Sequence, residues 1–177
     1  MYTWKTYTYN TLHFRIEVFD SDKIGKDKSL GKVEISKADL GSNGPTWIPL
    51  KGVKSGEVLI NSELLAPGQS PTGYAGDGQD YPTAGDDKDG KSRRPGSVAG
   101  GKKSGILGDH DGPLLHVDLI KARDLIKTDM IGKSDPYAVL KYADQKDKTP
   151  VVKNTQNPKW DHSSDFTLNV NNNTPLM

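Results

Sequence analysis

The sequence predicts an all-β fold, an antiparallel sandwich of short strands. In several short stretches apolar residues alternate with polar ones, which is the pattern of strands with one buried face. Polar turns rich in Gly, Asn, Asp and Pro separate these stretches, and no window has the apolar period of an amphipathic helix. Short strands joined by polar turns are typical of a two-sheet sandwich.

Eight strands are predicted, four on each side of a segment of different composition. They are 12–18, 30–35, 46–50 and 57–65 before it, and 115–119, 137–142, 149–153 and 160–170 after it. In 12–18, for example, Leu, Phe, Ile and Val occupy every second position. The strand at 160–170 follows the turn pair Asn157-Pro158. Each side alone would leave open sheet edges and half a core.

The segment between these groups, residues 66–112, is predicted to be a disordered linker. Gly, Pro, Ser and Asp dominate it, and its large aliphatic residues are only Val98, Ile106 and Leu107. Such a composition buries too little apolar surface to offset the entropy of ordering it. The chain is therefore divided into 1–65, 66–112 and 113–177.

The composition also limits the class of function of this 177-residue chain. A formal net charge of +1 provides no bulk attraction for nucleic acid. The absence of cysteine excludes disulfides, thiolate metal sites and a thiol nucleophile. No stretch approaches the roughly 20 apolar residues of a membrane span. An enzyme is not expected, because the four histidines have no metal-ligand spacing and no serine lies in a Gly-x-Ser-x-Gly motif.

Two turns collect carboxylates that point to a metal. One contains Asp20-x-Asp22 followed by Asp27, and the other contains Asp129 and Asp135. Calcium takes six to eight oxygen ligands in a flexible geometry, which neither turn supplies alone but two converging loops could. The alternative is that these acids are ordinary solvated turn residues. The residues alone leave both interpretations open.

Seven short motifs occur in a recognisable order. They are RIEVFDSD at 15–22, SLGKVEI at 29–35, WIPL at 47–50 and GEVLI at 56–60, then LHVDLIKARDL at 115–125, GKSDPYAVL at 132–140 and NPKW at 157–160. The last three resemble the first half of a C2 domain, and the first four resemble the second half of one. The resemblance implies an eight-stranded antiparallel C2-type sandwich with calcium loops at one end. More narrowly, the chain resembles tandem-C2 membrane proteins such as the tricalbins and extended synaptotagmins, which implies a parent protein involved in lipid transport.

The resemblance implies that aspartates of two loops bind Ca²⁺. The implied metal ligands are Asp20, Asp22, Asp27, Asp129 and Asp135. The C2 pattern has a carboxylate where this chain has Lys28, and Asp27 lies one residue earlier. A lysine at that position weakens calcium binding unless Asp27 replaces the missing ligand, so the affinity for calcium stays open.

The resemblance also implies contact with lipid. The matching positions of the basic concave face that binds phosphoinositide headgroups are Tyr137, Lys141, Lys146 and Lys148. The apolar residues implied to insert into the membrane at the loop tips are Ile24, Met130 and Ile131. Each lysine near an anionic surface contributes about 1 kcal/mol. The alternative for the lysines is that they protect a sheet edge from aggregation.

The motifs that resemble the second half of a C2 domain precede those that resemble the first half. This order raises the question of how the two halves fold. One possibility is that 1–65, the C-terminal half of one C2 domain, pairs with 113–177, the N-terminal half of the next, in one permuted sandwich. The linker is long enough for this, because the cost of loop closure grows slowly with length. Asp129 and Asp135 would then meet Asp20 and Asp22. The other possibility is a truncated fragment without independent function.

The sequence therefore predicts a non-enzymatic, peripheral membrane-binding module. It would dock on anionic phospholipid or phosphoinositide under the influence of calcium. The alternative is a calcium-independent C2 domain that binds other proteins as a scaffold. The expected location is the cytoplasmic face of a membrane, with the parent protein at contacts between endoplasmic reticulum and plasma membrane. The sequence does not predict an oligomeric state.

Overall fold

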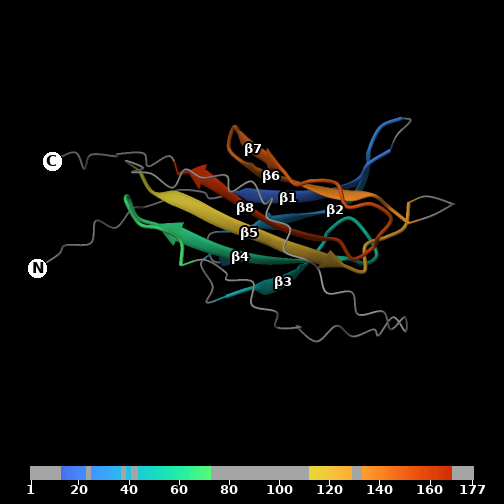
Figure 1. Ribbon diagram of the computed structural model, residues 1–177, viewed down its shortest axis with the longest axis horizontal. Helices are drawn as coiled ribbons and strands as arrows, with labels where there is room; N and C mark the ends of the chain where they lie inside the picture. Colours follow the sequence, from blue (N-terminus) through green and yellow to red (C-terminus); the bar gives the residue numbers. More distant parts are fainter. Residues whose placement is uncertain are drawn as a thin grey trace, which may run out of the picture.

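Two four-stranded antiparallel sheets pack face to face (Figure 1). The computed structural model describes residues 13–22, 25–36, 39–40, 44–72, 112–128 and 133–168. The strands are β1 (Phe14–Asp20), β2 (Lys28–Ile35), β3 (Thr46–Pro49), β4 (Glu57–Leu65), β5 (Leu114–Arg123), β6 (Pro136–Tyr142), β7 (Gln145–Lys148) and β8 (Lys159–Thr167). The first sheet has the order β2-β1-β6-β7 and the second sheet the order β3-β4-β5-β8. The predicted all-β sandwich is confirmed.

Strands from the two sides of the predicted linker pair with each other in both sheets. All seven residues of β1 have antiparallel partners on β6, with Phe14 opposite Tyr142. In the other sheet, all nine residues of β4 have partners on β5, with Leu65 opposite Leu114. The segments before and after the linker therefore lie side by side in one sandwich.

Only the first residues and the last residue of the predicted linker are among the described residues. Of its residues 66–112, the range 73–111 lies outside the described residues. The first part is held against β4, because Thr72 donates from its amide and its hydroxyl to the Glu63 carboxylate, at 3.0 and 2.7 Å. The predicted start of the linker coincides with the end of β4 at Leu65.

The core lies between the sheets and is built from the inward-facing residue of every second position. On β1 these are Phe14, Ile16 and Val18, and on β5 Leu115, Val117 and Leu119, all of them buried. The rings of Phe14 and Phe166 pack edge to face with centroids 5.3 Å apart. Each such side chain contributes about 1.5–3 kcal/mol when removed from water. The alternation that predicted the strands thus also predicts the buried face.

One predicted strand is wrong, and one short strand was not predicted. Residues 149–153 form no strand, because Pro150 has no amide hydrogen and the Thr149 hydroxyl accepts the hydrogen bond of the Ala138 amide at 2.9 Å. On the side of β6 away from β1, the pairing strand is instead β7. Its sequence, Gln-Lys-Asp-Lys, lacks an apolar residue, so it gave no periodic signal. The other seven predicted strands overlap β1 to β6 and β8.

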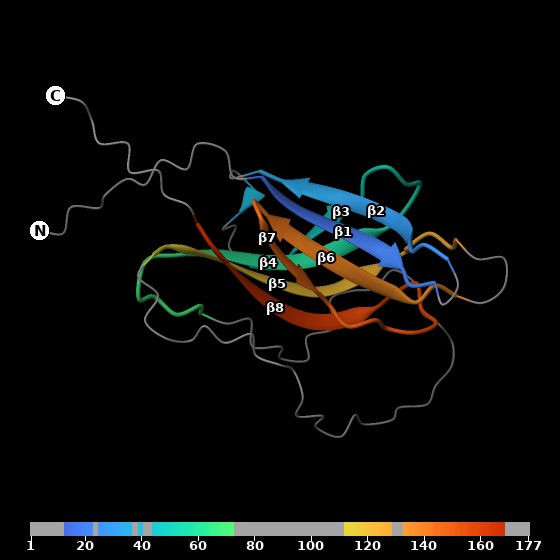
Figure 2. The same ribbon diagram turned by 90° about the horizontal axis from the view of Figure 1, so that it is seen from above.

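Four loops gather at the end of the sandwich where β1 and β5 finish (Figure 2). These are the described parts of 21–28, 50–56, 124–135 and 149–158, together called the loop end. Backbone hydrogen bonds join them, from Ser21 to the Asp135 carbonyl and from Leu125 to the Gln156 carbonyl, both at 3.1 Å. The loop end is therefore a fixed surface to which both halves of the chain contribute.

A close approach between β2 and the loop 50–56 requires a glycine. Gly31 has a φ of +117°, and a Cβ at this position would lie 2.8 Å from the Val53 side chain and 2.9 Å from that of Leu50. No larger residue has room there. The contact holds one edge of the loop end against the first sheet, and a backbone bridge between Lys32 and Lys51 continues it.

Candidate functional site

Asp20 joins the end of β1 to the loop that follows β5. Its side chain is only 1% exposed. One carboxylate oxygen accepts the Asp135 amide at 2.7 Å, and the other accepts the Thr128 hydroxyl at 2.5 Å. Burial alone would raise the pKa of Asp20, but these hydrogen bonds outweigh it and hold the pKa below its usual value. Asp20 and Asp135, predicted to share a site, are brought together through this contact.

Asp22, Asp27 and Lys28 lie in the turn that follows β1. The Asp22 amide donates to the Asp27 carboxylate at 3.1 Å, and the Lys28 ammonium lies 3.6 Å from a carboxylate oxygen of Asp22. The second Asp27 oxygen accepts the hydroxyl of Tyr137 at 2.5 Å. The hydrogen bond from Tyr137 is the main reason that the pKa of Asp27 is lowered. Burial, followed by the same contact, raises the pKa of Tyr137 to about 12.

The described carboxylates do not by themselves form a calcium site. Both oxygens of Asp20 and both of Asp27 already accept hydrogen bonds from the protein, whereas calcium takes six to eight oxygens. Within the described ranges no group of three or more His, Cys, Asp or Glu residues is arranged to hold a metal ion. The predicted ligand Asp129 and the predicted insertion residues Ile24, Met130 and Ile131 lie outside the described residues. The complete predicted ligand set stays a prediction.

The predicted lipid-binding residues share the outer face of the first sheet. Tyr137, Lys141, Lys146 and Lys148 are here called the lysine face. Lys141 and Lys146 are directly opposed across β6 and β7, and neither makes an ion pair within the described part of the chain. The Lys148 ammonium lies 3.7 Å from the centroid of the Tyr137 ring, which stacks in turn on Phe19 at 5.5 Å. Tyr137 is thus in contact with both Lys148 and Phe19, whereas Lys141 and Lys146 stay without an ion pair in the described structure.

The same outer face continues onto β1 and β2, which the sequence reasoning did not include. Lys32 lies opposite Glu17, and Glu17 accepts the Ser29 hydroxyl at 3.1 Å. Arg15 is paired with Glu34 at 3.1 Å. The alternation in 12–18 and 30–35 placed the charged residues Arg15, Glu17, Lys32 and Glu34 on the polar side of their strands, so the signal was present. The paired charges of β1 and β2 leave the excess positive charge at β6 and β7.

The C2 domain family matches residues 1–50 and 113–177 of the chain. The chain belongs to the C2 domain family. It is 29% identical over 155 residues to extended synaptotagmin-1 of Pongo abelii, and the matched region covers 86% of this chain and 12% of that protein. It is 41% identical over 61 residues to extended synaptotagmin-3 of Xenopus tropicalis, covering 31% of this chain and 7% of that protein. The predicted resemblance to C2 proteins of the extended synaptotagmin kind is confirmed.

Further comparisons show how small a part of its relatives this chain covers. Synaptotagmin-3 of Arabidopsis thaliana is 44% identical over 50 residues, which cover 27% of this chain and 9% of that protein. This chain thus spans 12% or less of the length of each of these three relatives. No solved structure matches it significantly. Among the described residues, no helix is long and apolar enough to cross a membrane.

The second sheet of this C2 sandwich carries a different polar cluster on its outer face. His116 is 7% exposed and lies between two carboxylates, 2.6 Å from Asp165 and 3.2 Å from Asp118. Asp118 also accepts hydrogen bonds from Ser163 and Asn61. Burial lowers the pKa of His116, but the two carboxylates outweigh it and raise the pKa to about 9. Sequence reasoning missed this cluster because the histidine spacing matched no metal site.

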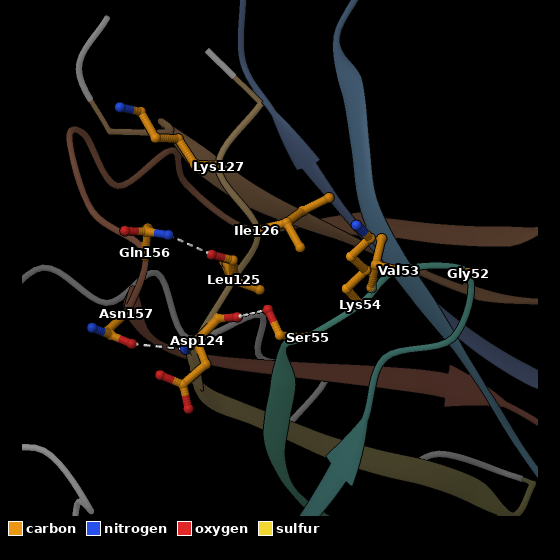
Figure 3. Close-up of a pocket in the computed structure, with 10 residues that line it drawn as sticks. All are labelled: Gly52, Val53, Lys54, Ser55, Asp124, Leu125, Ile126, Lys127, Gln156 and Asn157. Atoms are coloured by element: carbon orange, nitrogen blue, oxygen red, sulfur yellow. Dashed lines mark hydrogen bonds between the residues drawn. The ribbon is translucent and has the colours of Figure 1, made fainter. Parts of the chain in front are cut away.

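A groove of about 740 Å³ opens at the loop end of the C2 sandwich (Figure 3). Three loops line it, at 52–55, 124–127 and 156–157. The Ser55 hydroxyl donates to the Asp124 carbonyl at 2.9 Å. On the other side the Gln156 side-chain amide donates to the Leu125 carbonyl at 2.7 Å. These hydrogen bonds fix the three loops relative to one another, so the groove is preformed.

Proposed function

We propose that this chain is a peripheral membrane-binding module that docks on anionic phospholipid through the lysine face. The observation that carries the proposal is the directly opposed pair Lys141 and Lys146, which has no ion pair in the described structure. Like charges directly opposite one another across two strands destabilise a sheet. A lipid phosphate bound between the two ammonium groups would remove that repulsion. The C2 family match and the relatives named extended synaptotagmins support this proposal.

The docking that we propose is carried by lysines rather than by calcium. The Lys28 ammonium lies 3.6 Å from a carboxylate oxygen of Asp22, which is one of the predicted calcium ligands. An ammonium group and a calcium ion compete for the same carboxylate oxygen. In this proposal the positive charge that contacts lipid phosphate therefore belongs to lysine side chains and not to a bound metal ion. Association should weaken with rising salt, because exposed charges are screened.

The test is sedimentation of the chain with vesicles of phosphatidylcholine alone and of phosphatidylcholine with phosphatidylserine or a phosphoinositide. We expect binding to the anionic vesicles only, equal in calcium and in a calcium chelator. Replacing both lysines in K141Q/K146Q should cost about 2 kcal/mol, or roughly 30-fold in affinity. The control is K121Q/K159Q, which removes an equally opposed lysine pair from the other sheet.

The alternative predicted from the sequence, a scaffold domain that binds other proteins without calcium, is favoured by one contact. The ion pair between Lys28 and Asp22 neutralises a carboxylate at the loop end without a metal. If the wild-type chain ignores every vesicle composition, the membrane proposal is overturned and the scaffold function takes its place. If binding appears only with calcium, the lysine-based mechanism is overturned.

We also propose that the two segments form one C2 domain in permuted order, with residues 1–65 and 113–177 as its parts. The pairing of β1 with β6 and of β4 with β5 supports this. A protease site introduced within 81–100 tests it. We expect the cleaved halves to elute as one species in size-exclusion chromatography and to melt in one cooperative transition. Separation of the halves after cleavage, without denaturant, would contradict the proposal.

A further inference from the structure

The loop end carries an excess of positive charge. Over its described residues, seven lysines face four aspartates. The lysines, all exposed, are Lys26, Lys28, Lys51, Lys54, Lys127, Lys133 and Lys153. The aspartates are Asp22, Asp27, Asp124 and Asp135. An end expected to be acidic from its carboxylate motifs is therefore basic once its loops are brought together.

The aspartates of this end are also more engaged than the lysines. Asp22 is paired with Lys28, and Asp27 accepts the Tyr137 hydroxyl. In contrast, Lys54 and Lys127 make no ion pair within the described part of the chain. Both of these lysines line the groove. Positive charge thus exceeds negative charge at the groove, where two lysines and one aspartate, Asp124, belong to the lining.

The groove combines this charge with apolar surface. Figure 3 shows Ile126 extending from the middle loop toward Val53 and Lys54, whereas Lys127 extends from the opposite side of that loop. Val53 and Ile126 are only partly buried and pack against the core. The groove therefore has an apolar strip with one lysine on each side of it. Its volume of about 740 Å³ lies in the range of small-molecule sites.

We propose that this groove holds the headgroup and glycerol region of one anionic phospholipid while it remains in a membrane. Lys54 and Lys127 contact phosphate or carboxylate oxygens, and Val53 and Ile126 contact the aliphatic part. The inference rests on the proposed function and adds a second contact point to the lysine face, without a metal. The occupant is a lipid because an apolar strip between two cations matches an amphiphile. A free anion would use only the charges.

The first test compares vesicle binding of the wild type and two double variants at fixed salt with calcium chelated. K54Q/K127Q should lower affinity for phosphatidylserine vesicles by roughly 30-fold, at about five- to sixfold per lysine. The control K121Q/K159Q should change it by less than twofold. Lys54 and Lys127 are exposed loop residues without ion pairs in the described structure, so folding should be unaffected; circular dichroism and a melt verify this. If K54Q/K127Q behaves like the control, the groove is not a lipid contact.

The second test separates a lipid from a free anion. Dihexanoyl phosphatidylserine below its micelle concentration should shift the amide NMR signals of Ser55, Leu125 and Lys127. Inorganic phosphate and dihexanoyl phosphatidylcholine at the same concentration should shift them at least fivefold less. Equal shifts with phosphate would overturn the lipid assignment. If vesicle binding depends on Lys141 and Lys146 while both groove tests fail, only the groove inference is lost; if wild type binds no anionic vesicle, the proposed function fails as well.

Discussion

The two sheets each carry a pair of lysines directly opposed across two strands, and the pairs have different surroundings. In the second sheet Lys121 lies 5.8 Å from the Trp47 ring, and Lys159 is paired with Asp161 at 3.3 Å. In the first sheet Lys141 and Lys146 have no ion pair within the described residues. The same local arrangement is therefore compensated internally on one face and uncompensated on the other. The proposed lipid contact is at the uncompensated pair, because a bound anion would offset its charge.

The second sheet also has buried charged residues, and these are paired with one another. His116, Asp118 and Asp165 satisfy one another, and Ser163 and Asn61 complete the hydrogen bonds of Asp118. Such a network stabilises the sheet only while every member is present, because an unpaired buried charge is costly. The second sheet thus pairs its buried charges within the fold, whereas Lys141 and Lys146 of the first sheet make no ion pair within the described residues.

The largest expected effect comes from breaking the buried network. Replacing His116 with alanine leaves Asp118 and Asp165 facing each other without a cation and should cost about 3–5 kcal/mol of unfolding free energy. Denaturant unfolding of the H116A variant measures this. The comparison is H162A, which removes the contact of a less buried histidine with Asp147 and should cost about 1 kcal/mol. Equal losses would mean that His116 carries no special share of the stability.

The same network predicts how stability depends on pH. The pKa of His116 in the folded chain, about 9, is raised above the ordinary value of 6.5, so the folded state binds this proton more tightly than the unfolded state. The contribution is complete below about pH 6.5 and is lost as the pH rises through 9. The difference between a pKa of about 9 and one of 6.5 corresponds to about 3 kcal/mol of unfolding free energy, at 1.36 kcal/mol per pKa unit. Unfolding at pH 6 and pH 9 should show this loss in wild type and not in H116A.

The sequence predicts the face of a residue better than its burial. Alternation placed Phe14 and Val117 inside and His116 and Asp118 outside, as observed. It gave no indication that His116 and Asp118 are only 7% and 8% exposed, because burial of an outer face depends on what covers it. Likewise β7 was missed because its four residues are all polar and its pairing is set by the turn after β6.

The candidate site was predictable from motifs to different degrees. The contact of Asp20 with Asp135 followed from matching two C2 half-patterns, which no local periodicity contains. The lysine face followed in the same way. The groove lysines Lys54 and Lys127 were not predicted, because they lie on loops about 70 residues apart in sequence that only the pairing of β4 with β5 brings together.

The smallest expected effect comes from removing the ion-pair partner of Lys159, so that the lysine pair of the second sheet becomes more like that of the first. Replacing Asp161 with asparagine frees Lys159 opposite Lys121, and asparagine tolerates the φ of 45° at this position. The ion pair is exposed, so D161N should cost no more than about 0.5 kcal/mol. If lack of an internal partner is what makes a lysine pair bind anionic membranes, D161N should raise vesicle affinity about twofold. The control D39N removes an equal charge from Asp39, whose carboxylate accepts hydrogen bonds from Ser36 and makes no ion pair within the described residues. Equal affinities of the two variants would mean that the surroundings of Lys141 and Lys146, above all the stacked Tyr137, decide where lipid binds.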